Sequence, residues 1–104
     1  MRIDRMVAGA ALAAALAPAQ GPSTSFSRDV RPILERSCLT CHGASQQLSS
    51  FSLLSREAAL RGGLHGAAIV PGKSGESALI GRLTGAVAPS MPLGGKLSAA
   101  EIAT

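Results

Sequence analysis

The sequence contains almost none of the large rings that usually fill a small hydrophobic core. Aromatic residues make up 2% of the 104 residues; they are Phe26 and Phe51, and there is no tryptophan or tyrosine. A chain this short buries little of its own surface, so it usually needs a cross-link or a cofactor to be stable. A buried flat apolar group would supply the missing volume, and the alternative is a loosely packed fold rich in alanine and glycine.

The sequence also lacks any run of lysine or arginine, although its formal net charge is +4. Beyond residue 20 the basic residues are spread along the chain, at Arg28, Arg31, Arg36, Arg56, Arg61, Lys73, Arg82 and Lys96. Nucleic-acid binding requires basic side chains that cluster on one face or form a stripe. The sequence therefore predicts no nucleic-acid partner.

The apolar run of residues 6–17 is too short to span a membrane, which takes roughly 20 residues. Two arginines precede this run, and an Ala-Pro-Ala cleavage site ends at Ala19, a pattern typical of a secretory signal peptide. We expect residues 1–19 to be a signal peptide cleaved near Ala19 and residues 20–25 to be a linker. The protein is then periplasmic or otherwise exported, with no integral membrane span, in a compartment where disulfides can form.

Helical periodicity and capping residues predict a small all-α fold. The first helix should begin with Ser27 as N-cap and end at Gly43, with Cys38 and Cys41 on its apolar face. Further helices are expected over Arg56–Arg61, capped by Ser55, over Gly75–Leu83, capped by Ser74, and from Ala99 onward, with residues 69–72 forming an extended segment into a turn and residues 85–95 a loop.

The last of these helices is announced by a capping box, in which Ser98 is followed three residues later by Glu101. The chain stops at Thr104, one turn into that helix. A helix of this length is barely stable without packing. We therefore expect the last helix to be truncated and the domain of residues 26–104 to be incomplete at its C-terminus.

One motif carries specific chemistry: Cys38-Leu39-Thr40-Cys41-His42 is a C-x-x-C-H sequence, the attachment signature of c-type haem. Two thiols three positions apart can form thioethers with the two vinyl groups of one porphyrin, and the adjacent imidazole can then bind the iron. We predict one haem c per chain, bonded to Cys38 and Cys41, with His42 as the proximal iron ligand.

Three other interpretations of the motif remain open. A thiol-disulfide redox centre normally sits in a strand-helix-strand setting, and no such alternation flanks these cysteines. A zinc site needs four ligands, and only His65 remains once the motif residues are counted. A structural disulfide between Cys38 and Cys41 is the third possibility in an exported protein.

The second axial ligand must come from elsewhere in the chain. After the signal segment the sequence offers one methionine, Met91, and one further histidine, His65. We favour Met91, because Pro89 and Pro92 stiffen the segment around it. Such methionine–histidine ligation would raise the reduction potential of the haem iron relative to ligation by two histidines. The alternatives are His65, which lies in a glycine-rich stretch, a water molecule, or a methionine that only fills a gap in the core.

Four of the basic side chains are candidate partners for the haem propionates: Arg56, Arg61, Lys73 and Arg82. Scattered basic side chains usually face solvent and contribute little. The sequence singles out none of the four.

Several blocks of the chain together resemble the planctomycete-type cytochrome c domain. These are Phe26-Ser27-Arg28-Asp29-Val30-Arg31-Pro32-Ile33-Leu34, the C-x-x-C-H motif with Gly43, Ser55 to Gly63, Ala68 to Ser77, Met91-Pro92, and Leu97 to Ile102. The resemblance implies a compact helical fold around one haem, Met91 as distal ligand, and an N-terminal position in longer exported proteins. The Leu93-Gly94-Gly95 that follows Met91-Pro92 departs from the family, which often has further prolines there.

These observations predict electron transfer by a covalently bound haem, with a redox partner protein or attached C-terminal domains as the partner. Apart from the C-x-x-C-H motif, nothing in the sequence suggests chemistry of any kind. We therefore expect an electron-carrier domain, not an enzyme. The alternatives are a haem-based sensor or peroxidase-like module with a displaceable Met91, and a thiol-disulfide module without haem.

Overall fold

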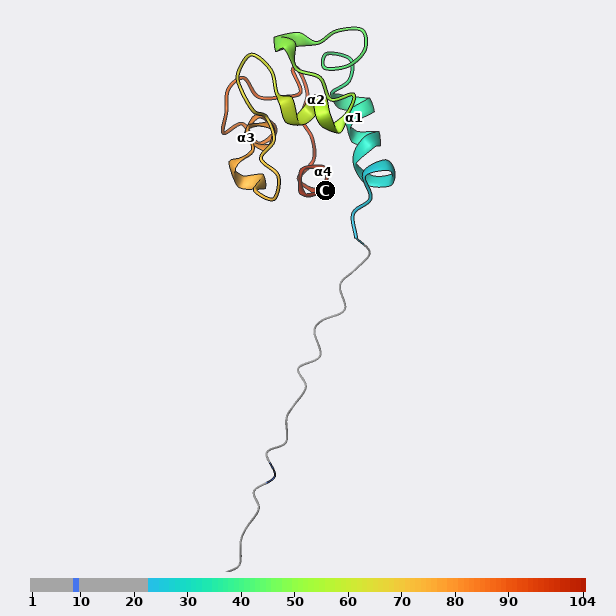
Figure 1. The fold of residues 1–104 in the computed structure, drawn as a ribbon, viewed down its shortest axis with the longest axis vertical. Helices are drawn as coiled ribbons and strands as arrows, with labels where there is room; N and C mark the ends of the chain where they lie inside the picture. The colour runs from blue at the N-terminus through green and yellow to red at the C-terminus, as the bar shows by residue number, and fades with distance from the viewer. Residues whose placement is uncertain (1–8, 10–22) are drawn as a thin grey trace, which may run out of the picture.

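The computed structural model describes residue 9 and residues 23–104, so the predicted signal peptide lies outside the described residues apart from Gly9. In the described part every regular element is a helix and no strand is present, which confirms the all-α fold class. Figure 1 shows α1 and α3 at opposite edges of the domain, with long irregular segments between the helices. No helix in this part of the chain is long and apolar enough to cross a membrane.

The chain enters the domain through a π-helical turn, η1 (Phe26–Val30), that runs into α1 (Arg31–Ser37). The Ser25 side chain accepts a hydrogen bond from the Arg28 N–H, so the N-cap is Ser25 and the prediction of Ser27 is wrong. The Asp29 carboxylate also accepts the Ser25 N–H at 2.8 Å, which fixes the entry of the chain. The apolar periodicity of the sequence does not show that the first turn is π-helical, and so it does not show that the cap lies two residues upstream of Ser27.

Helix α1 ends at Ser37, six residues before the predicted end at Gly43. Cys38 is its C-cap residue, and residues 38–41 form a turn. The prediction that both cysteines lie on the helix is therefore wrong, because Cys38 is the C-cap residue and Cys41 lies beyond it. Helical spacing alone cannot distinguish a helix from a turn that continues the same i to i−4 bonding for one more step.

Helix α2 (Arg56–Arg61) has the predicted bounds. The Ser55 side chain accepts the Ala58 N–H at 3.1 Å, and Gly62 closes the helix with a φ of 74°, a conformation that favours glycine. The helix buries Ala58 and Ala59.

The predicted third helix begins later than the sequence indicated. Ser74–Glu76 forms a 3₁₀ turn, η3, and α3 runs from Ala78 to Thr84 with Ser77 as its N-cap residue. Buried Ser77 donates to the carbonyls of Val70 and Lys73 and accepts the Val70 N–H at 2.9 Å. The predicted turn after Val70 is confirmed, and the serine hydroxyl joins it to the start of α3 in place of the predicted Ser74 cap.

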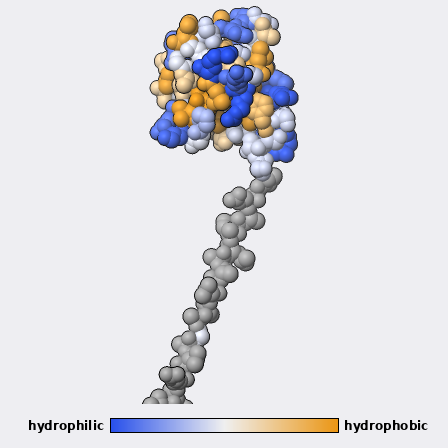
Figure 2. All heavy atoms as spheres, in the orientation of Figure 1, coloured by the Kyte–Doolittle hydropathy of each residue, from blue (hydrophilic) through white to orange (hydrophobic). Residues whose placement is uncertain are grey.

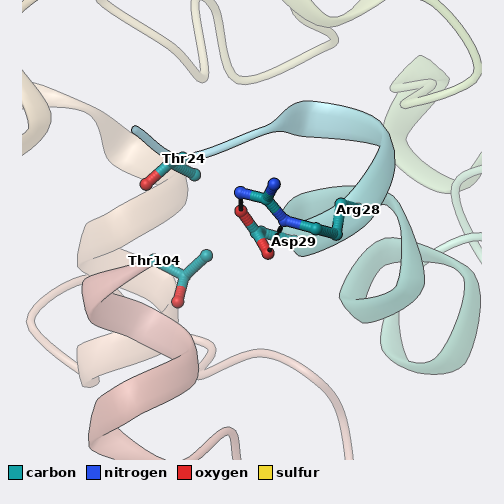
Figure 3. A pocket seen from close by; sticks show the side chains of 4 residues that line it. All are labelled: Thr24, Arg28, Asp29 and Thr104. Atoms are coloured by element: carbon teal, nitrogen blue, oxygen red, sulfur yellow. Dashed lines mark hydrogen bonds and ion pairs between the residues drawn. The ribbon is translucent and has the colours of Figure 1, made fainter. Parts of the chain in front are cut away.

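The capping box of the last helix is confirmed. Helix α4 (Ala99–Ala103) has Ser98 accepting the Glu101 N–H and Glu101 accepting the Ser98 N–H. Glu101 also forms an ion pair with Arg36 of α1. Thr24 and Thr104 line one open polar pocket beside Arg28 and Asp29, so the two ends of the domain lie together (Figure 3).

The domain buries few apolar side chains completely. In the described residues the buried apolar side chains are Ala58, Ala59 and Leu97. A larger set is half-buried: Ile33, Leu34, Leu39, Leu53, Leu60, Ile69, Val70, Leu79, Ile80, Leu83 and Ile102. Figure 2 shows apolar and charged residues interleaved on the visible face. The aliphatic residues of this fold thus retain much apolar surface that is not covered by protein.

Candidate functional site

The turn after α1 brings Cys38, Cys41 and His42 together. The Cys38 N–H donates to the Leu34 carbonyl at 2.8 Å and so completes α1. The N–H groups of Cys41 and His42 then both donate to the Cys38 carbonyl, at 3.2 Å and 3.0 Å. The Cys38 carbonyl therefore closes a turn at this point. We call residues 38–43 the attachment turn.

Both cysteines of the attachment turn are half-buried and free. Burial raises the pKa of the Cys38 thiol, so this sulfur is protonated at neutral pH. Two unbonded sulfurs on one turn are the groups that thioether formation with two vinyl carbons requires. No disulfide occupies either of them.

The His42 ring is oriented by the backbone of a later segment. Its Nδ1 lies 3.1 Å from the Phe51 carbonyl oxygen, and its ring packs edge-on against the Phe51 ring at a centroid distance of 5.2 Å. A carbonyl oxygen only accepts hydrogen bonds, so Nδ1 must carry the proton in this arrangement. The lone pair is then on Nε2, the nitrogen that is free to bind a metal.

Backbone hydrogen bonds fix the segment that presents the Phe51 carbonyl. The Leu48 N–H donates to the Cys41 carbonyl and the Leu53 N–H to the His42 carbonyl, both at 2.9 Å. Gly43 is buried, and a Cβ atom at this position would lie 2.1 Å from the Leu39 carbonyl oxygen. The attachment turn therefore requires glycine directly after the histidine.

Met91 comes from a different part of the chain, the segment of residues 85–95 that we call the methionine loop. Its N–H donates to the Arg82 carbonyl at 2.8 Å, and its side chain is half-buried. The peptide bonds before Pro89 and Pro92 are both cis. Residues 84–90 and 93–96, on either side of Met91 and Pro92, are exposed.

His65 lies exposed in a tight turn between Gly63 and Gly66, which exchange two backbone hydrogen bonds. Among the candidate propionate partners, Lys73 pairs with Glu76 at 3.7 Å, and the Arg82 guanidinium donates to the carbonyls of Ala88 and Pro89. Arg56 and Arg61 are exposed and pair with no carboxylate among residues 23–104. Lys73 and Arg82 thus already have protein partners.

The donor set of the attachment turn fits a haem. Two free half-buried thiols stand beside an imidazole whose Nε2 carries the lone pair. The half-buried aliphatic side chains of α1, α2 and α3 would gain burial against a flat apolar ring, at about 25 cal/mol per Å² of apolar surface covered. The thiols, the imidazole and the half-buried aliphatic side chains are therefore chemically compatible with a haem.

The competing interpretations of the motif find no support in the described residues. A thioredoxin-like centre belongs to a strand-helix-strand unit, and residues 23–104 contain no strand. Nor does this part of the chain contain a group of at least three histidine, cysteine, aspartate or glutamate side chains placed to hold a metal ion. The described structure therefore lacks both the setting of a thiol-disulfide module and the ligands of a zinc site.

Sequence reasoning missed two features of the site: the Phe51 carbonyl that orients His42, and the contacts of Arg82 with the methionine loop. Both depend on backbone carbonyl groups, which every residue possesses, so residue type gave no signal for either.

Comparison with known proteins gives one match. The family model described as planctomycete cytochrome C matches residues 38–92, which is more than half of the chain and includes the attachment turn and Met91. No curated protein and no solved structure matches the chain. The motif, the all-α fold and this match lead to one conclusion: the chain belongs to the planctomycete cytochrome c family.

Proposed function

We propose that this domain carries single electrons on one haem, with Cys38 and Cys41 as its covalent attachment points and His42 and Met91 as the iron ligands. The family implies a covalently bound haem c. Such an iron supplies a one-electron change of oxidation state. The chain itself anchors, orients and shields the group.

The hydrogen bond between His42 Nδ1 and the Phe51 carbonyl carries this proposal. It selects the tautomer with a free lone pair on Nε2 and makes that nitrogen a stronger donor. Edge-on packing against Phe51 limits rotation of the imidazole ring. A histidine held in this way changes little when the iron changes charge, which is the requirement for fast electron transfer.

We further propose that the domain works after export and cleavage near Ala19, in the periplasm or an equivalent compartment. Residues 20–25 would link the cleavage site to the helical domain of residues 26–104. The electron donor or acceptor would be a partner protein or a domain attached C-terminally. The domain would serve as a carrier and would not itself catalyse a reaction.

The test is to express the full chain in a host that exports proteins and attaches c-type haem. We expect an intact mass equal to residues 20–104 plus one haem, and a low-spin reduced absorption spectrum. Cys38→Ala together with Cys41→Ala should abolish the covalent addition, whereas Ser49→Ala, in an exposed turn nearby, should leave it intact. Well-folded, colourless protein of unmodified mass would refute the cytochrome assignment and favour a thiol-disulfide role.

A second function, a small-ligand sensor or peroxidase-like module, is favoured by the exposure of the methionine loop on both sides of Met91. A displaceable Met91 would open one coordination position. Carbon monoxide distinguishes the two functions, because it binds only reduced iron with an open position. Rapid binding to the native reduced protein would support the sensor, and an unchanged six-coordinate spectrum would support the carrier.

A further inference from the structure

The methionine loop is held to α3 mainly by one residue, Arg82. Four hydrogen bonds join Arg82 to residues 88–91: its guanidinium Nη1 donates to the carbonyls of Ala88 and Pro89, at 3.0 Å and 3.3 Å, and its own carbonyl accepts from the Ser90 hydroxyl and the Met91 N–H, at 3.3 Å and 2.8 Å. Both ends of this one residue therefore bind the same short segment.

The position of Arg82 explains why it can do this. It lies in the last turn of α3, where the final carbonyl groups of a helix have no partner within the helix. The methionine loop supplies those partners, because Val87 donates to the Gly81 carbonyl at 3.0 Å and Met91 to the Arg82 carbonyl. The Arg82 guanidinium donates to the carbonyls of Ala88 and Pro89, which accept no hydrogen bond from any other described side chain.

The backbone of Met91 matters more than its side chain for ligand placement. A methionine side chain has three rotatable bonds and adapts easily, so it does not fix its own sulfur. Ordering a free loop costs conformational entropy each time the sulfur binds. A loop that is already ordered by Arg82 avoids much of that cost, and the bound state of Met91 is favoured accordingly.

We infer that Arg82 is a positioning residue that holds Met91 in place as the second iron ligand and so keeps the distal side of the haem closed. This inference rests on the proposed function. It also assigns Arg82 a role other than pairing with a propionate, because its guanidinium is already bound to Ala88 and Pro89.

The test compares haem-loaded wild type with Arg82→Met, which keeps the apolar stem and removes the donors, and with Arg82→Lys, which keeps a donor. Arg31→Met, at the exposed start of α1, is the matched control. The readouts are the sulfur-to-iron charge-transfer band of the oxidised protein, the reduction potential, and the rate of carbon monoxide binding to the reduced protein.

We expect Arg82→Met to weaken the charge-transfer band, lower the potential and speed carbon monoxide binding about 10-fold or more, in line with other outer-shell partners of metal ligands. Arg82→Lys should lie between Arg82→Met and wild type, and Arg31→Met should match wild type. Ser90→Ala removes only the hydroxyl contact and should give a smaller change in the same direction, which keeps the test valid if Arg82→Met fails to fold.

The failures are distinguishable. A wild type that takes up no covalent haem would overturn the proposed function and this inference with it. A wild type with haem whose spectrum is unchanged by Met91→Ala would show that Met91 is not a ligand. A wild type ligated by Met91, with Arg82→Met and Ser90→Ala indistinguishable from it in all three readouts, would overturn the role of Arg82 alone.

Discussion

The attachment turn and the methionine loop supply the two sides of the proposed iron site, and they are held in different ways. In the attachment turn, backbone groups bond to backbone groups within a continuous stretch that includes Leu34, Cys38 and Leu53. The methionine loop instead depends on Arg82, in the preceding helix, and its flanking residues are exposed.

Because of this difference, we expect the attachment turn to be held more permanently than the methionine loop. Under the proposed function, the proximal ligand His42 lies in a segment held by backbone hydrogen bonds, so it is fixed wherever the domain is folded. The proposed distal ligand, Met91, would be released by opening the methionine loop alone, because local openings cost less than global unfolding. Under the proposed function, the attachment turn would retain the haem, and the contacts of the methionine loop would set how readily the second coordination position opens.

The largest expected effect separates the two ligands. His42→Ala should remove the proximal nitrogen and abolish the low-spin spectrum, because the other described histidine, His65, lies exposed in the turn between Gly63 and Gly66. Met91→Ala should keep the covalent haem, lower the potential and raise the apparent affinity for carbon monoxide by at least about 10-fold. Mass spectrometry and reduced spectra measure both; equal behaviour of the two variants would erase the distinction between the segments.

The next effect tests the rigidity of the attachment turn. Gly43→Ala would place a Cβ 2.1 Å from the Leu39 carbonyl oxygen, so backbone must move, and we expect the free energy of unfolding to fall by about 1–3 kcal/mol. Gly75→Ala, where nothing lies within 4 Å of the added carbon, is the matched control. Urea denaturation of both variants measures the difference; an unaltered Gly43→Ala midpoint would mean that the turn yields easily.

Ser77→Ala tests whether α3, the support of the methionine loop, is itself firmly attached. The substitution leaves the Val70 N–H without its acceptor in a half-buried position, and should cost about 1–3 kcal/mol. Ser74→Ala, at an exposed serine of η3, should be close to neutral. If denaturation shows the same loss for both, the Ser77 hydroxyl does not hold α3.

The helix ends that could be predicted are those set by capping residues, which act over a short stretch of sequence. Ser55 and Gly62 bound α2 as predicted, and Ser98 with Glu101 forms the predicted capping box, because each of these signals acts within four residues. The first helix was predicted too long, since Cys41 keeps helical spacing in a turn that is no longer helix. The hydrogen bonds of His42 to the Phe51 carbonyl and of Arg82 to the loop carbonyls could not be predicted, because tertiary structure decides which carbonyl lies beside each side chain.

A smaller and more selective effect is expected at Gly81, which faces the methionine loop. A Cβ there would meet Val87 Cγ2 at 2.6 Å, a side-chain atom that can move with the loop. Gly81→Ala should therefore leave global stability nearly unchanged, since alanine also favours the helix by about 1 kcal/mol, while carbon monoxide binding becomes faster. The double variant Gly81→Ala with Val87→Ala should restore the slow rate; if it does not, the loop is not displaced by this contact.

The smallest expected effect is a loss of folding stability at acid pH. It should not act directly on the attachment turn or the methionine loop. Neither residues 38–53 nor residues 85–95 contain an aspartate or glutamate, whereas Asp29 binds Arg28 and the Ser25 N–H at the start of η1. These hydrogen bonds, that to Arg28 foremost, lower the pKa of Asp29 to about 2. A carboxylate whose pKa is lower in the folded state stabilises above its unfolded value, near 4, and this contribution disappears as the pH falls toward about 2.

Urea denaturation at a series of pH values checks this behaviour. Wild type should be slightly more stable than Asp29→Asn at about pH 5, and the two should converge near about pH 2. Over the same range the charge-transfer band of Met91-ligated protein should not distinguish the two proteins, because Asp29 anchors η1 and contacts neither ligand segment. Loss of that band in Asp29→Asn at pH 5 would instead show that the entry of the chain and the methionine loop are coupled, and that the distal ligand is not adjusted independently.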